Sequence, residues 1–81
     1  FKKQILEAHY SIKGRSGKPV IIIKGFNGTK NEIKDLAKLL KSHCGAGGSV
    51  KDGQILIQGN HREKIVSKLQ EIGHSVKLVG G

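Results

Sequence analysis

The side chains of this sequence that are best suited to chemistry are cationic. Fifteen Lys and Arg stand against six Asp and Glu in 81 residues, a formal net charge of +9. This balance favours a polyanionic partner, with nucleic acid first and an anionic membrane second. No stretch approaches the roughly 18–20 apolar residues of a membrane span. Neither predicted helix is the Trp- and Phe-rich amphipath of a membrane interface. The sequence therefore predicts nucleic-acid binding and no membrane partner.

Six of the Lys and Arg residues lie in positions 1–24, where Glu7 is the only acid. A glycine-containing polar loop, 14–19, separates two apolar runs there, so we expect a hairpin with a basic tip. Glycine allows such a loop to press against a curved backbone, Arg can bind phosphate with two hydrogen bonds, and Lys acts as a point charge. The predicted contacts are the tip and its shoulder: Lys13, Gly14, Arg15, Ser16, Gly17 and Lys18. An ordinary solvated loop is the alternative.

A second group of lysines follows the spacing of a helix. Its members are Lys30, Lys34, Lys38 and Lys41. At about 100° per residue these positions form one ridge beside an apolar stripe. The ridge is either part of the same RNA-binding surface or an ordinary solvated helix face.

His61 and Arg62 open a second predicted helix. Cations are mildly unfavourable at the positive end of the helix dipole, and their presence there indicates a role in anion binding. The alternative is structural, with Arg62 paired to a nearby carboxylate or to a strand carbonyl.

The sequence predicts a binding protein and no enzyme, cofactor or metal site. No two acids are expected on adjacent strand ends, as a general acid and base would be. Cys44 could act as a nucleophile with a histidine, but it falls on the apolar helix stripe and is expected to be a small buried side chain. Three histidines can be imagined with Cys44 around a metal, although no ligand spacing supports such a site. They are His43, His61 and His74.

The glycine run at 45–49 is expected to cap a helix and then approach the sheet closely. It lacks the Gly-Lys-Ser/Thr ending of a nucleotide-binding loop and leads from helix to strand, so its amides do not crown a helix N-terminus. Backbone contact with a polyanion is the alternative. The aromatic residues Phe1, Tyr10 and Phe26 form no pair on one strand for base stacking, so recognition of RNA backbone and shape is expected.

Apolar periodicity and turn residues predict the order β-β-α-β-β-α-β. The strands are expected near 10–13, 20–24, 49–51, 54–58 and 75–79, and the helices near 30–43 and 61–72. Thr29 with Glu32, and Asn60 with Glu63, are predicted to form N-terminal capping boxes, and Asp52-Gly53 a tight hairpin turn. Two amphipathic helices and one sheet give a two-layer α/β sandwich, with both helices on one face of a mostly antiparallel or mixed sheet.

The length predicts one domain over 1–81. The single cysteine excludes an internal disulfide, and no signal-peptide pattern is present, so the cytoplasm is the expected location. The sequence begins at Phe1 and contains no methionine. We therefore expect an N-terminal segment to precede it.

Three segments resemble the translation initiation factor 1 family of eukaryotes, archaea and some bacteria. They are GRSGKPVIIIKGF at 14–26, GAGGSVKDGQILIQGNHR at 45–62 and IGHSVKLVGG at 72–81. The last of these is most similar to bacterial members. Ala46 stands where the family usually has Thr, and Asn60 where it usually has Asp.

The resemblance implies a two-layer α/β fold and binding to the small ribosomal subunit near the P site. There the factor would monitor start-codon pairing, with initiator tRNA and other initiation factors as further partners of a monomer. The basic loop of the family falls on 14–18, and its rRNA-facing helix lysines on Lys34, Lys38 and Lys41. Eukaryotic members approach initiator tRNA through a longer loop, where this chain has only Asp52-Gly53. A general RNA-binding protein or RNA chaperone is the alternative function.

Overall fold

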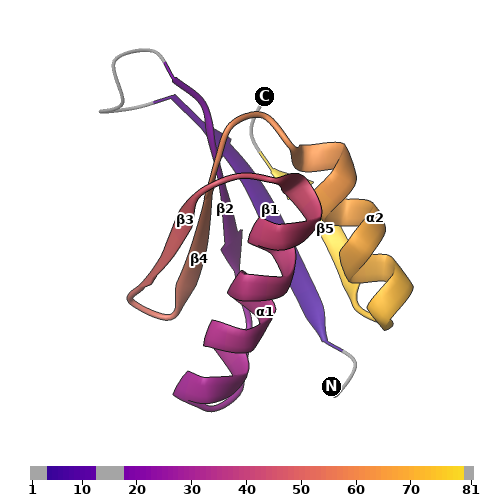
Figure 1. The fold of residues 1–81 in the computed structure, drawn as a ribbon. Coiled ribbons are helices and arrows are strands. Elements are labelled where there is room, and N and C mark those ends of the chain that lie inside the picture. Colours follow the sequence, from indigo (N-terminus) through magenta and orange to yellow (C-terminus); the bar gives the residue numbers. More distant parts are fainter. Residues whose placement is uncertain (1–3, 13–17, 80–81) are drawn as a thin grey trace.

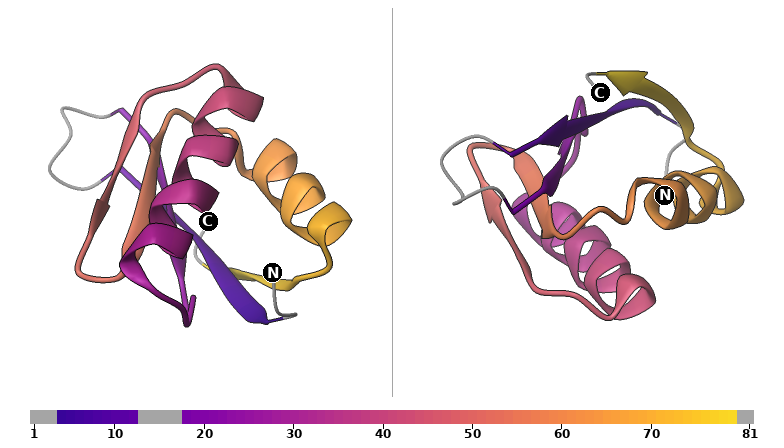
Figure 2. Two further views of the ribbon diagram at one scale, coloured as in Figure 1. Left: turned by 60° about the horizontal axis from the view of Figure 1, so that its bottom comes forward. Right: turned by 90° about the horizontal axis from the view of Figure 1, so that it is seen from above.

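The computed structural model describes residues 4–12 and 18–79 as two packed layers. The elements in chain order are β1 (Ile5–Ser11), β2 (Val20–Lys24), α1 (Lys30–Cys44), β3 (Gly48–Lys51), β4 (Gln54–Gln58), α2 (Arg62–Ile72) and β5 (Ser75–Val79). The sheet order is β3-β4-β2-β1-β5, and only the β1–β5 pair is parallel. Both helices cover the same face of this mixed sheet (Figures 1 and 2). The predicted two-layer α/β fold is therefore confirmed.

The core lies between the sheet and the two helices, as the apolar periodicity predicts. The predicted α1 stripe, from Ile33 to Cys44, is buried at each of its five positions. Ile55 and Ile57 of β4 are both fully buried, whereas Leu56 between them is half-buried on the opposite face. This alternation follows from the two-residue period of a strand that is covered by helices on one side only.

Both ends of α1 carry the predicted caps. The Glu32 backbone N–H donates to Thr29 Oγ1 at 3.1 Å, and the Thr29 N–H donates to Glu32 Oε1 at 2.7 Å. The Thr29 backbone N–H is the largest cause of the lowered pKa of Glu32, because it donates to the ionised carboxylate, and the Thr29 side chain adds to this effect. Gly45 ends the helix in the left-handed region at φ 62°. The local signals therefore fix the length of α1.

Replacing Thr29 with Ala should lower the free energy of unfolding by about 1 kcal/mol, because the helix loses a side-chain acceptor for its first N–H groups. Urea unfolding followed by circular dichroism measures the change. Thr29→Ser keeps the hydroxyl and should stay within about half of that loss. Equal losses in the two variants would contradict the capping role.

Two local predictions differ from the structure. β1 begins at Ile5, not near Tyr10, because pairing with β2 on one side and β5 on the other extends a strand whose own pattern is irregular. Helix α2 is preceded by His61 as its N-cap, without a side-chain capping bond, so the predicted Asn60–Glu63 box is wrong. The turn at Asp52-Gly53 is confirmed, with φ of 51° and 72°.

Gln4 ties the start of β1 to two neighbouring segments. Its side-chain amide donates to the Asn27 carbonyl at 2.7 Å and accepts from the Asn27 N–H at 2.6 Å. Its backbone N–H donates to Nδ1 of the buried His74 at 3.1 Å, and its carbonyl accepts from the Ser75 N–H at 2.8 Å. These bonds hold together the loop after β2, the start of β1 and the start of β5. No helix among residues 4–12 and 18–79 is long and apolar enough to cross a membrane.

Burial lowers the pKa of His74 below its ordinary value of 6.5. Below pH 6.5 the unfolded chain therefore binds more protons than the folded chain, and the free energy of unfolding should fall as the pH drops from 7.5 to 5.5. The slope due to one proton cannot exceed about 1.4 kcal/mol per pH unit. Urea unfolding across this range, compared with His74→Gln, isolates the effect from the other histidines. A variant with the same pH dependence as the parent protein would contradict the assignment.

Candidate nucleic-acid interface

The α1 lysines lie beside the outer strand of the sheet. Lys34, Lys38 and Lys41 line one groove, together with Ala37 of the same helix and residues Ser49 and Val50 of β3. The groove has a volume of about 460 Å³. It forms because α1 turns its apolar stripe onto the sheet, which leaves its lysine flank facing the edge strand β3. We call this feature the lysine groove.

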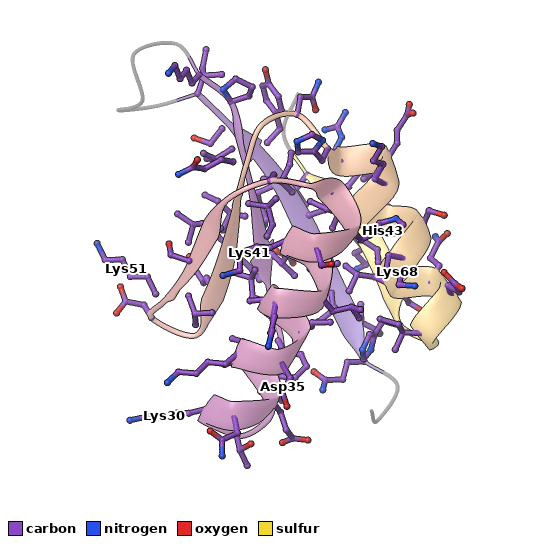
Figure 3. The ribbon with its side chains drawn as sticks, in the orientation of Figure 1. Lys30, Asp35, Lys41, His43, Lys51 and Lys68 are labelled. Carbon is purple, nitrogen blue, oxygen red and sulfur yellow. The ribbon has the colours of Figure 1, made fainter. Side chains whose placement is uncertain are left out.

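The charge of this side of the molecule is not neutralised internally. Within residues 4–12 and 18–79 no α1 lysine forms an ion pair, whereas Glu7 contacts His9 and Glu71 pairs with Lys68. Figure 3 places Lys30, Lys41 and Lys51 on the side of the β3–β4 hairpin, whereas His43 and Lys68 lie toward α2. Closely spaced ammonium groups with no carboxylate partner attract a chain of phosphates. The helix ridge is therefore available to a polyanion.

The predicted hairpin tip lies largely outside the described residues. This applies to Lys13, Gly14, Arg15, Ser16 and Gly17, which stay predictions. Lys18 is exposed and lines a separate hollow of about 360 Å³ with Pro19, Val20, Gln58 and Gly59. The Gly59 N–H donates to the Pro19 carbonyl at 2.9 Å, which fixes this hollow at the end of β4. Lys18 thus lies near the start of α2, and the structure does not bring it into the lysine groove.

Arg62 has a structural contact that the sequence offers no signal for. Its guanidinium carbon lies 6.0 Å from the centre of the Tyr10 ring, a cation–π geometry that joins α2 to β1. His61 leans over Gly59, because a Cβ on that glycine would lie 2.7 Å from His61 Nε2. His61 and Arg62 both line a hollow of about 350 Å³ at the start of α2. His61 and Arg62 therefore form a second basic location, apart from the lysine groove.

Cys44 and the glycine run were the other candidates for chemistry. In the part of the chain that the structure describes, no three His, Cys, Asp or Glu side chains are placed to hold a metal ion. Cys44 is buried, as predicted, and burial raises the pKa of its thiol above the ordinary 9.0. A protonated, covered thiol is a poor nucleophile. The glycine run caps α1 at Gly45 and brings Gly48 against β4, so its structural interpretation is confirmed.

The fold and the groove define the class of this protein as a small, basic two-layer α/β domain with a lysine-lined surface groove. A family model described as "Translation initiation factor SUI1" matches residues 2–75. The chain therefore belongs to the SUI1 translation initiation factor family, and the resemblance read from its motifs is confirmed. Membership supports a role in translation initiation.

The similar proteins come from archaea and bacteria. A protein translation factor SUI1 homolog of Methanocaldococcus jannaschii is 46% identical over 66 residues, which are 82% of this chain and 64% of that protein. Two bacterial proteins called YciH, described as uncharacterized, also match. The Escherichia coli one is 48% identical over 68 residues, 84% of this chain and 63% of its own length. The Salmonella typhimurium one is 44% identical over 77 residues, 95% of this chain and 71% of its own length. The chain thus spans about two thirds of the length of these relatives.

Proposed function

We propose that this protein is a translation initiation factor that binds the small ribosomal subunit near the P site and modulates the selection of start codon and initiator tRNA. It acts by binding, without catalysis, in the cytoplasm, where other initiation factors are further partners. The observation that carries the proposal is the lysine groove in a member of the SUI1 family. Ribosomal RNA is the polyanion that a translation factor meets, and folded RNA presents the phosphate rows that closely spaced lysines bind.

The proposed docking surface joins the lysine groove to the basic hairpin. In both views of Figure 2 the ends of β1 and β2 that lead toward residues 13–17 lie on the β3 side of the sheet. Lys18, His61 and Arg62 lie near the end of the sheet where α2 begins. Contacts at the lysine groove and at this end would engage two separated stretches of RNA backbone. Such a surface reads the shape of the RNA more than its sequence.

Co-sedimentation with purified small and large ribosomal subunits at two salt concentrations tests the function. We expect binding to small subunits that weakens steeply with salt, and little binding to large subunits. Competition then separates ribosome specificity from general RNA binding, because small subunits should displace the protein from an equal mass of bulk RNA. Equal competition by both would favour the general RNA-binding protein or RNA chaperone. Absence of binding to small subunits at low salt would refute the proposal.

A further inference from the structure

The lysine groove continues into a second hollow of different chemistry. This hollow has a volume of about 420 Å³ and lies between the start of α1 and the β3–β4 turn. Lys34 and Val50 line both hollows, so the two form one continuous depression along α1. The volume falls within the range of roughly 300–1,000 Å³ that is typical of small-molecule sites. A chain bound in the lysine groove would therefore reach this second hollow.

The lining becomes more apolar along this path, although Lys30 and Lys34 also line the second hollow. Phe26, Ile33 and Val50 supply apolar walls, and Phe26 and Val50 are only half-buried, so part of their surface faces outward. Asp52 is the one acid among the residues that line the two hollows. A phosphate is attracted to the lysines and repelled by Asp52, whereas an aromatic wall suits the face of a base. The two hollows thus match the two parts of a nucleotide.

The Phe26 ring is held in place by its neighbours. A Cβ on Gly28 would lie 2.9 Å from Phe26 Cε2, so the ring rests against a position that only glycine leaves open. Two hydrogen bonds from the Gln4 side chain hold the loop at Asn27, the residue between Phe26 and Gly28. Phe26 also packs against the hydrophobic core. A ring fixed before binding loses little conformational entropy when a base stacks on it.

We propose that the hollow at Phe26 receives one unpaired base of an RNA strand whose phosphates run along Lys34, Lys38 and Lys41. This inference rests on the proposed function, since it requires the lysine groove to bind RNA. A carboxylate such as that of Asp52 accepts hydrogen bonds, so it favours a base with an exocyclic amino group as donor. Cytosine, adenine or guanine is therefore preferred over uracil. The groove takes RNA that has an unpaired nucleotide in preference to a continuous duplex.

Phe26→Leu tests the aromatic wall while it retains an apolar side chain for the core. Binding is measured by fluorescence anisotropy with labelled ten-nucleotide strands of cytidine, and of abasic ribose phosphate as the matched control. We expect Phe26→Leu to bind the cytidine strand about 5- to 150-fold more weakly, the equivalent of about 1–3 kcal/mol of stacking. Its affinity for the abasic strand should equal that of the parent protein. Thermal unfolding verifies that both proteins are folded.

Phe26→Trp provides a direct reporter, because the sequence contains no other tryptophan. Its emission should be quenched by the cytidine strand and not by the abasic strand, and its affinity should match or exceed that of the parent protein. Asp52→Asn tolerates the same left-handed backbone. It should reduce the ratio of cytidine to uridine affinity, whatever its effect on overall affinity.

The outcomes separate this inference from the proposed function. Suppose that replacing Lys34, Lys38 and Lys41 with Gln weakens RNA binding but that Phe26→Leu binds the cytidine strand as tightly as the parent protein. This result would overturn the base site and leave the lysine groove as the RNA-binding site. If the same lysine replacements leave the affinity for small ribosomal subunits unchanged, the lysine groove is not the RNA-binding site. If the tryptophan emission of Phe26→Trp is not quenched when the variant binds the cytidine strand, the base site is overturned as well. An apolar protein side chain would then be the occupant to test.

Discussion

Replacing Lys34, Lys38 and Lys41 together with Gln is expected to abolish most of the affinity for small ribosomal subunits at low salt. Each phosphate that a lysine neutralises contributes about 0.7–0.9 to the slope of log affinity against log salt, so the slope should fall by about 2–3. If the two slopes differ by 2, each tenfold drop in salt concentration increases the affinity of the parent protein about 100-fold more than that of the variant. Gln preserves helix propensity, so α1 should remain folded. A salt titration of subunit binding measures both quantities.

A matched triple variant removes the same charge from other surfaces. Lys24, Lys68 and Lys77 lie outside the lysine groove, on β2, α2 and β5. Their replacement with Gln also lowers the net charge by three, but it should leave the salt slope within about one unit of the parent value. Equal losses in both triple variants would mean that binding depends on total charge alone. The lysine groove would then not be the docking site.

The elements that could be predicted from the sequence are those specified by neighbouring residues. Helix α1 carries its own start signal at Thr29 and Glu32, its apolar stripe, and its stop at Gly45. The Asp52-Gly53 turn likewise contains the residues that tolerate its backbone. The start of β1 could not be predicted locally, because its first residues, Ile5 and Leu6, become a strand through pairing with β5, and pairing with β2 begins only at Glu7. The start of α2 could not be predicted locally either. Asn60 is a residue type that suits an N-cap, but after Gly59, at φ 96°, the chain begins the helix one residue later, with His61 as the N-cap.

In the candidate site, too, local sequence predicts some features, whereas others arise only from tertiary packing. The spacing of Lys34, Lys38 and Lys41 predicts a common flank, and the structure places all three in one groove. The opposite wall comes from β3, and which helix flank faces that strand depends on how α1 packs on the sheet. The Tyr10–Arg62 contact and the hollow at Phe26 bring together residues that are distant in sequence. No local pattern encodes them, so only the three-dimensional arrangement reveals these features.

Gly48, the last glycine of the run that leads into β3, is expected to be the least replaceable glycine of that run. A Cβ on Gly48 would lie 2.3 Å from the Leu56 carbonyl oxygen and 3.1 Å from Ile57 Cδ1. The oxygen belongs to the backbone of the paired strand, so it cannot move without disturbing the β3–β4 register at Gly48 and Ile57. Gly48→Ala should therefore lower the free energy of unfolding by about 1–3 kcal/mol. For a domain of this size the midpoint of thermal unfolding would fall by about 4–8 °C for each kcal/mol.

Gly47→Ala is the matched control, one residue away in the same run. Its Cβ would meet only the end of the Gln58 side chain, at 3.2 Å from Oε1, and that side chain can swing aside. We expect a change within about 0.5 kcal/mol. Because Gly48 begins the strand that forms one wall of the lysine groove, Gly48→Ala should also weaken RNA binding at temperatures where the variant is still folded. If both alanine variants unfold at the same temperature as the parent protein, the close approach of β3 to β4 is not as the structure describes it, and the wall of the lysine groove would have to be placed differently.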